Sequence, residues 1–298
     1  MYRFKIIADS TSDLPLVLRE KYDIDYCRMS ITCDDKEYVA DLDYKEYSAK
    51  ELYDWMRNGK RVFTSQVADN EFREVFKKYL DQGIDILYIA CSSALSASYL
   101  ASLKVRDELL ALYPDRKIIC IDSKISCIGQ GSLCIEASKL KEQGKSLEEV
   151  VEWIENNKLK FNQFATVESL EFLKRAGRVK ASKAFFGNLF GIKPIIISDI
   201  NGRNFAFKKA KGRLKAIDEL ATLAIEAMDG NYDQVVYIGH ADSLDDALLI
   251  KKKMQEKQPK IQNFEIGFIG PIVGASTGPG TLGVFVFGKE VTLDEESE

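Results

Sequence analysis

Short apolar runs alternate with longer amphipathic stretches through the first half of the chain. The apolar runs have β-strand character and cover residues 4–8, 84–90 and 117–121. Helical periodicity follows each of them, over residues 14–20, 94–113 and about 126–139. Because successive strands joined through helices form right-handed crossovers, this order predicts a parallel sheet.

The pattern changes after a helical stretch at residues 146–155. An apolar run at residues 191–200 ends in the turn Asn201-Gly202, and Phe205 begins a returning strand, so antiparallel pairing is predicted. A helix at 213–228 and strands at 234–239, 265–270 and 284–287 complete the chain. We therefore predict an α/β protein with two domains: an N-terminal Rossmann-like parallel-sheet domain, residues 1–158, and a C-terminal mixed-sheet α/β domain, residues 159–298.

Composition and charge narrow the class of protein. Of the 298 residues, 46% are hydrophobic and 30% are charged, which is typical of a globular chain. The formal net charge of −4 argues against non-specific nucleic-acid binding, which needs a cationic surface. No apolar run approaches the roughly 18 residues of a membrane span, and the start of the chain lacks a signal peptide. We expect a cytoplasmic protein without an integral membrane segment.

The residues that usually carry metal or cofactor chemistry are sparse. The six cysteines include no Cys-x-x-Cys pair, and His240 is the only histidine, so no metal site is predicted and the thiols are expected to be free. The first strand is not followed by Gly-x-Gly-x-x-Gly, and neither a Walker A lysine motif nor a Gly-x-Ser-x-Gly elbow occurs. The sequence thus predicts neither a cofactor nor a catalytic residue.

Hydroxyl side chains gather where the predicted strands end, the usual place for ligands in open α/β sheets. The hydroxyl residues in these positions are Ser10, Thr11, Ser12, Ser92, Ser93, Ser96, Ser123 and Ser126. Taken singly, each is best explained as a helix cap. Thr64 differs, because Thr64-Ser65-Gln66 reads as a loop with no helix to cap. A glycine-rich loop is predicted at residues 274–280, and together these groups suit an anion.

Two further segments allow both a structural and a functional interpretation. Residues 170–178 form a helix end that contains Arg175 and Arg178, whose cations either complement the helix C-terminus or dock a partner. The apolar residues 185–192 read as core, or as a lid or the wall of a lipid tunnel. The side chains that would form such a wall are Phe185, Phe186 and Phe190.

Taken together, the motifs resemble the DegV family, whose characterised members include the fatty acid-binding subunits of bacterial fatty acid kinase. The resemblance covers nearly the whole chain. The segments that carry it, in order, are residues 9–15, 64–66, 92–96, 122–123 with 129–131, 177–179, 192–195, and 269–271 with 277–280.

The resemblance implies two α/β domains with a long-chain fatty acid bound between them. It places the fatty acid carboxylate at Thr64 and Ser96, with Ser65, Ser276 and Thr277 next to them, and the acyl chain in the second domain. It also implies an ATP-dependent fatty acid kinase as partner, with Arg178 as a contact. Ser276 departs from the family pattern, which usually has histidine there; serine can form hydrogen bonds but cannot carry an imidazolium charge.

The resulting hypothesis is a carrier, not a self-sufficient enzyme. It binds a long-chain fatty acid in a buried tunnel and presents the carboxylate to the kinase for acyl-phosphate formation. Burial of a long acyl chain supplies most of the affinity, at roughly 0.8 kcal/mol for each methylene group. Two alternatives stay open: an enzyme that binds a small phosphorylated metabolite at the hydroxyl-rich loops, and a regulatory module.

Overall fold

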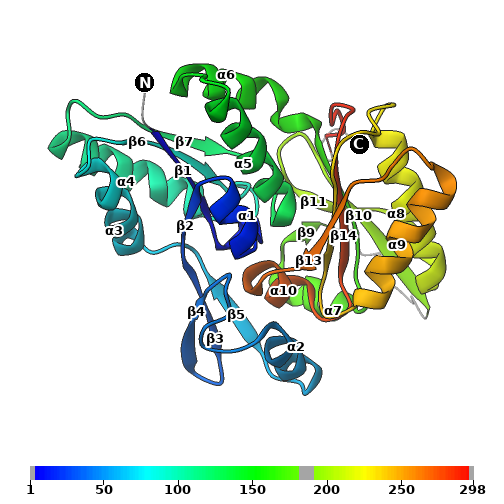
Figure 1. Cartoon of the computed structure of the whole chain (residues 1–298). Coiled ribbons are helices and arrows are strands. Elements are labelled where there is room, and N and C mark those ends of the chain that lie inside the picture. Colours follow the sequence, from blue (N-terminus) through cyan, green and yellow to red (C-terminus); the bar gives the residue numbers. More distant parts are fainter. Residues whose placement is uncertain (1–3, 181–190, 295–298) are drawn as a thin grey trace.

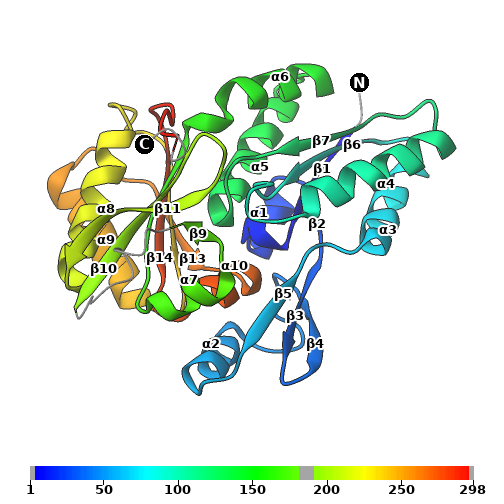
Figure 2. The ribbon, with the colours of Figure 1, turned by 180° about the vertical axis from the view of Figure 1, so that it is seen from behind.

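The computed structural model describes residues 4–180 and 191–294, which form three β-sheets and the helices packed on them (Figures 1 and 2). The first sheet has the strand order β2-β1-β6-β7. Its strands are β1 (Phe4–Asp9), β2 (Ile24–Cys27), β6 (Asp85–Ala90) and β7 (Ile118–Asp122). Every pairing in this sheet is parallel, which confirms the prediction.

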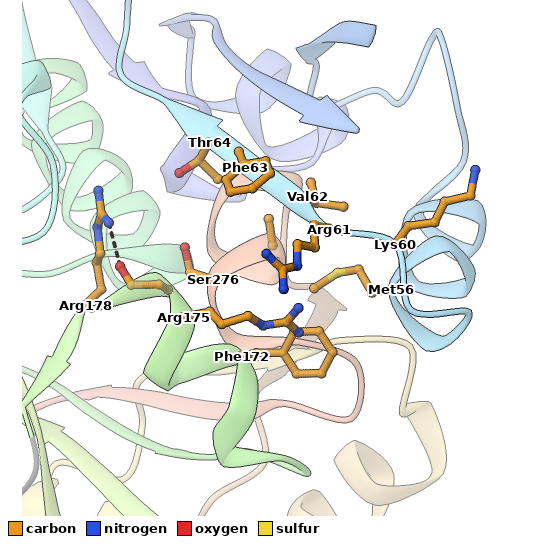
Figure 3. A pocket seen from close by; sticks show the side chains of 12 residues that line it. Met56, Lys60, Arg61, Val62, Phe63, Thr64, Phe172, Arg175, Arg178 and Ser276 are labelled. Atoms are coloured by element: carbon orange, nitrogen blue, oxygen red, sulfur yellow. Dashed lines mark hydrogen bonds between the residues drawn. The ribbon is translucent and has the colours of Figure 1, made fainter. Parts of the chain in front are cut away.

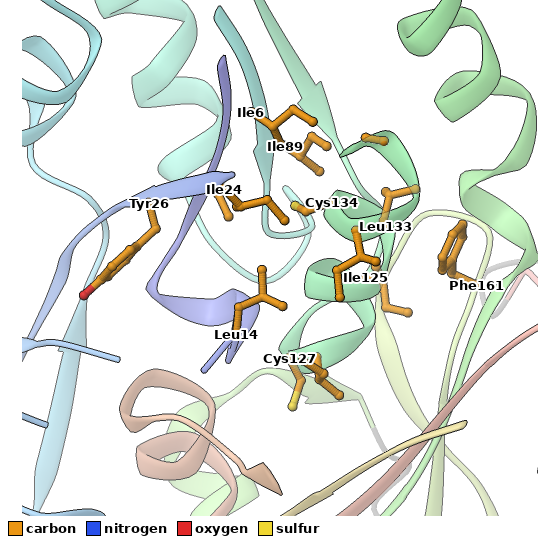
Figure 4. Close-up of a cluster of buried hydrophobic side chains, with 14 of the residues drawn as sticks. Ile6, Leu14, Ile24, Tyr26, Ile89, Ile125, Cys127, Leu133, Cys134 and Phe161 are labelled. Carbon is orange, nitrogen blue, oxygen red and sulfur yellow. The ribbon is translucent and has the colours of Figure 1, made fainter. Parts of the chain in front are cut away.

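Helices cover both faces of the parallel sheet, which explains why its strands are apolar on both sides. Ile7 belongs to the core under α3 (Asp69–Leu80) and α4 (Ser98–Leu112). Its neighbour Ile6 belongs to the core under α5 (Cys127–Glu142) and α6 (Leu147–Asn157), and Figure 4 shows Ile6 and Ile89 beside Leu133 and Cys134 of α5. Two short helices, η1 (Ser10–Ser12) and α1 (Leu16–Lys21), follow β1.

The helix expected from residue 94 begins only at Ser98, after an ordered loop. Within this loop the Ser92 hydroxyl accepts a hydrogen bond from the Ala94 amide, and the Ser96 hydroxyl accepts one from the Ser98 amide. Serine side chains that bind nearby amides in this way compete with helix formation. The loop therefore stays open at the end of β6, and its Ser92 hydroxyl reaches the second half of the chain, where it donates to the Gly202 carbonyl.

A small antiparallel sheet of order β4-β3-β5, absent from the sequence prediction, projects from the parallel sheet together with α2 (Ala49–Arg57) (Figure 1). Its strands are β3 (Met29–Cys33), β4 (Lys36–Ala40) and β5 (Val62–Ser65). Asp34 and Asp35 both have positive φ (50° and 59°), as a tight hairpin turn between β3 and β4 requires. Thr64 lies on β5, so its assignment to a loop was wrong.

The third sheet is mixed and has seven strands in the order β13-β12-β14-β8-β10-β11-β9. Its strands are β8 (Phe161–Thr166), β9 (Val179–Lys180), β10 (Ile192–Ser198), β11 (Asn204–Lys211), β12 (Val236–His240), β13 (Phe264–Phe268) and β14 (Leu282–Phe287). The predicted hairpin forms between β10 and β11, with Gly202 in the turn at φ 75°. The mixed α/β class is thus confirmed.

Helices α8 (Arg213–Ala227) and α9 (Leu244–Lys257) pack on one face of this sheet, and α5 lies against the other. A short 3-10 helix, η2 (Lys158–Lys160), joins α6 to β8. The division into two domains at residues 158 and 159 falls in this connection and stays a prediction.

Helix α10 (Pro271–Thr277) includes residues 274–277 of the glycine-rich loop that we predicted at 274–280, so the prediction was wrong for those residues, while 278–280 are not helical. Pro271 at the first turn favours helix initiation, because its missing amide hydrogen would have no partner there. A Cβ atom on Gly274 would overlap the side chain of the buried Tyr53 of α2. Glycine at this position therefore serves close packing of α10 on α2.

Candidate binding site

A cavity of about 190 Å³ lies where the three sheets meet, and we call it the inner cavity. Its walls combine hydroxyl groups with apolar side chains from both halves of the chain. The lining includes Thr64, Ser65, Leu95, Ser96, Ser126, Leu173, Arg178, Asn204, Ile272, Val273, Ser276 and Thr277. All five residues predicted to bind a carboxylate are among them.

Thr64 reaches the inner cavity from the edge strand β5, where it pairs with Ile31 of β3. Side chains alternate along a strand, and Val62 and Thr64 are less exposed than Phe63 and Ser65. In the part of the chain that the structure describes, the Thr64 side chain forms no hydrogen bond, and neither does that of Ser65. Both hydroxyl groups are therefore available to a ligand.

Ser96 is held in place by a chain of hydrogen bonds. Its hydroxyl oxygen lies 3.0 Å from that of Ser98, which accepts a bond from the Val67 amide. The Ser96 oxygen also accepts a bond from the Ser98 amide at 3.2 Å. Either hydroxyl can be the donor in the Ser96–Ser98 bond, and when Ser98 donates, the Ser96 proton is available for a bond to a ligand carboxylate.

Ser276 and Thr277 line the inner cavity from the last turn of α10. The Ser276 hydroxyl donates to the Ile272 carbonyl at 3.2 Å, and the Thr277 hydroxyl donates to the Val273 carbonyl at 2.9 Å. Both protons are thus engaged within the helix. The two residues are placed correctly, but they are weaker donors to an anion than Thr64 and Ser96.

A second cavity of about 280 Å³, the outer cavity, adjoins the first and shares Thr64, Arg178 and Ser276 with it (Figure 3). Four cationic side chains line it: Lys60, Arg61, Arg175 and Arg178. No carboxylate is among its described lining residues. The outer cavity consequently favours anions or an acidic partner surface.

The four cations differ in how they are held. Lys60 pairs with Asp34 at 2.6 Å, which raises the pKa of the lysine. Arg175, at the end of α7 (Leu170–Ala176), lies over the Phe172 ring at 4.8 Å. Arg178 donates to the carbonyl groups of Ala176 at 2.5 Å and Leu95 at 3.4 Å, and no ion pair is found for it within residues 4–180 and 191–294. Its charge is thus uncompensated at the boundary of the two cavities.

Asp9 fixes the loops that surround the inner cavity. One of its carboxylate oxygens accepts from the Thr11 amide at 2.9 Å, and the other accepts from Tyr88 and from the Cys91 amide, at 2.9 and 3.1 Å. The carboxylate thereby ties the end of β1 to the end of β6. Asp9 is thus a positioning residue.

The remaining predictions lie away from the cavity or outside the described residues. Phe185, Phe186 and Phe190, the predicted tunnel wall, lie outside them. His240 is buried in β12 at 4% exposure, and burial lowers its pKa. All six cysteines are buried free thiols. Within the described residues we find no cluster of potential metal ligands and no helix long and apolar enough to cross a membrane.

Sequence reasoning missed three features of the site. Arg61 of the outer cavity precedes β5, whose four residues are too few for a clear periodic pattern. Asn204 lies beside the inner cavity because β11 pairs with β9 and β10. Ser126 was among the hydroxyl residues at the strand ends but was not predicted to bind the ligand. Its position directly before α5 was the available signal.

Comparison with known proteins places the chain in a family. A family model described as "Uncharacterised protein, DegV family" matches residues 3–289. A DegV domain-containing protein of Clostridium perfringens is 39% identical, covering 97% of this chain and 98% of its own, and one of Lactococcus lactis is 30% identical, with coverage of 96% and 98%. The chain belongs to the DegV family.

Solved structures agree with this assignment. A DegV family protein from Thermus thermophilus, described as fatty acid binding, superposes with a TM-score of 0.86 at 26% identity, covering 96% of this chain and all of that one. A stearic acid-binding protein from Eubacterium ventriosum gives 0.84 at 25% identity, with coverage of 95% and 98%. Both similarities span both halves of the fold.

Proposed function

We propose that this protein binds a long-chain fatty acid with its carboxylate in the inner cavity. The observation that carries the proposal is that one cavity contains both free hydroxyl groups, those of Thr64 and Ser65, and apolar walls such as Leu95 and Val273. An acyl chain gains affinity by leaving water, and neutral hydroxyls orient the carboxylate by charge-assisted hydrogen bonds. The fatty acid ligands of the similar Thermus and Eubacterium proteins support this assignment.

Thr64 and Ser96 are the proposed carboxylate ligands, with Ser65 beside them. Ser276 and Thr277 contribute less, because their protons are engaged within α10. The acyl chain would continue past Leu173 toward the apolar cluster of Val167, Leu173 and Ile196 on the third sheet. This route leads into the second half of the chain.

Binding is tested by extracting the purified protein with organic solvent and analysing the extract by mass spectrometry. We expect about one fatty acid per chain. The proposal would be excluded by two results together: protein that was never delipidated yields no fatty acid, and it takes up none from a detergent-free suspension.

We further propose that the bound carboxylate is presented to a separate ATP-dependent kinase. A carboxylate oxygen would attack the γ-phosphorus of ATP held by that partner, and the bond to ADP would break as the acyl phosphate forms. Arg175 and Arg178 lie at the outer cavity, where such a partner would approach. Trapping the acyl phosphate with hydroxylamine, with a purified fatty acid kinase subunit and ATP, tests this step; Arg175→Gln should slow it without weakening fatty acid binding.

The cationic outer cavity favours one alternative, a protein that binds a small phosphorylated metabolite. A thermal-shift screen separates the two functions, because a ligand that binds the folded state raises the melting temperature. Stabilisation by sugar phosphates or nucleotides, and none by fatty acids, would favour the alternative.

A further inference from the structure

The inner cavity is bordered by a polar trio on the face of the third sheet that looks toward the first. Asn204 lies at its centre: its Oδ1 accepts hydrogen bonds from Gln163 Nε2 at 2.6 Å and from Ser198 Oγ at 2.9 Å. These two bonds fix the orientation of the amide, because Oδ1 must face both donors. Neighbouring positions on the same face, Ala165 and Ile196, are apolar.

The other end of the Asn204 amide has no partner among the described residues. Nδ2 carries two protons, and neither is donated to any group in the described ranges 4–180 and 191–294. Because Asn204 lines the inner cavity, these donors are open to a hydrogen bond with a ligand there. The same two strands that fix Oδ1 therefore leave a donor available to a ligand.

Ser126, which reaches the cavity from the first half of the chain, repeats this situation. It is the residue before α5, yet its side chain makes no capping bond to the helix. A serine in this position ordinarily accepts a bond from an amide of the first turn. Ser126 is only 6% exposed, and its hydroxyl has no hydrogen bond within the described part of the chain. It too lines the inner cavity.

With the Asn204 amide and the Ser126 hydroxyl, the cavity has more hydrogen-bonding groups than a carboxylate needs. Its two oxygens accept about four hydrogen bonds. Thr64, Ser65 and Ser96 together with the unpaired guanidinium of Arg178 supply that number. An unsubstituted alkyl chain would take water away from Asn204 and Ser126 without replacing its hydrogen bonds, which is unfavourable.

We propose that the preferred ligand is a hydroxy fatty acid whose hydroxyl lies on carbon 2 or carbon 3. This inference rests on the proposed fatty acid function. Asn204 Nδ2 donates to the ligand hydroxyl oxygen, and Ser126 Oγ accepts its proton, so that both unsatisfied groups are used. The oxygen must be near the carboxylate, because the cavity of about 190 Å³ equals only about six water molecules in volume.

The test compares the dissociation constants of four ligands by isothermal titration of delipidated protein. The ligands are hexadecanoate and its 2-hydroxy, 3-hydroxy and 16-hydroxy derivatives. Two added hydrogen bonds should make the better of the 2- and 3-hydroxy acids bind about 2- to 10-fold tighter than hexadecanoate. The 16-hydroxy acid should show no gain, because its hydroxyl lies at the far end of the chain.

Two variants assign the effect to the named side chains. Ser126→Ala should abolish most of the preference, and it should bind hexadecanoate at least as tightly as the wild type, because the acyl chain then covers no unsatisfied hydroxyl. The fold should tolerate the change, because the Ser126 hydroxyl has no hydrogen bond among the described residues. Asn204→Ala should act in the same direction, with folding checked by thermal unfolding. Ser132→Ala is the matched control, because Ser132 lies on the same helix, bonds to the Gly129 carbonyl and does not line the inner cavity.

The outcomes separate this inference from the proposed function. If hexadecanoate binds as tightly as both the 2- and 3-hydroxy acids, or if both variants keep the preference, the hydroxy acid proposal is wrong while fatty acid binding stands. An equal gain for the 16-hydroxy acid would also overturn it. If none of the four ligands binds, the proposed function itself fails.

Discussion

The thiol of Cys127 donates a hydrogen bond to a carboxylate oxygen of Asp13 across 2.8 Å of buried space. Both residues have positive φ, 51° for Asp13 and 58° for Cys127, so each is held in a backbone conformation that is uncommon for its type. A Cβ atom on Gly270, directly before α10, would overlap the Asp13 carboxylate. Asp13 therefore joins the end of η1, the start of α5 and the start of α10.

Asp13 should make stability depend on pH. Burial raises its pKa from the ordinary 3.8 to about 7, so the folded protein holds a proton that the unfolded chain releases above pH 4. Unfolding free energy should therefore fall as pH rises from about 4 to 7, by roughly 4 kcal/mol from this residue alone.

The measurement is the pH profile of urea unfolding for the wild type and for Asp13→Asn. The variant cannot ionise, so the difference between the two profiles should grow in favour of the variant across this window. The comparison cancels the opposite contribution of His240, which both proteins retain. Parallel profiles would mean that Asp13 titrates at its ordinary pKa.

Replacing both Thr64 and Ser96 by alanine should weaken fatty acid binding by roughly 10- to 100-fold, because each removes a hydrogen bond to a charged group. Residual binding is expected, since the acyl chain stays buried. Titration with hexadecanoate measures the loss. Thr32→Ala is the control, because Thr32 lies on β3 next to β5 but does not line the inner cavity. If the double variant and Thr32→Ala lost the same amount of affinity for hexadecanoate, Thr64 and Ser96 would have no specific role in binding.

Ser276→His should strengthen carboxylate binding in acid. An imidazole there has room in the outer cavity and becomes a cation below its ordinary pKa of about 6.5. We expect the affinity for hexadecanoate to rise about 3- to 10-fold over wild type at pH 6 and to change little at pH 8. Ser276→Ala should lower affinity less than Thr64→Ala does, because the Ser276 hydroxyl donates within α10. Equal losses in these two variants would mean that Ser276 binds the carboxylate as directly as Thr64.

Gly274→Ala should lower the unfolding free energy by about 1–3 kcal/mol, because the added methyl group overlaps Tyr53, which donates to the Ile269 carbonyl. Gly267→Ala is a matched control: its Cβ would meet no atom within 4 Å and its φ is not positive. Thermal and urea unfolding of both variants test the expectation. Similar effects of the two substitutions would contradict the packing argument.

The sequence predicted the elements whose signal is local. β1 and the β10-β11 hairpin follow from apolar runs and from the turn at Gly202. The small sheet was missed because β5 has four residues and pairs with β3, about thirty positions earlier. Glycine content concealed α10, whose helical form depends on packing against Tyr53.

As with the fold, only part of the site could be predicted from the sequence. Motif resemblance selected Thr64, Ser96 and Ser276, and the fold brings them to one cavity; their role as ligands stays a prediction. The same motifs gave no sign of Asn204, because its orientation is set by Gln163, 41 positions away in the chain. Such a network depends on strand register, which local pattern does not encode.

Thr64, Ser96 and Ser276 come from the small sheet, the loop after β6 and α10. A ligand that touches all three acts as a crosslink between these segments, in addition to contacts that already join them, such as the bond from the Val67 amide to the Ser98 hydroxyl. Occupancy should therefore suppress hydrogen exchange in all three segments at once, including amides far from any ligand atom.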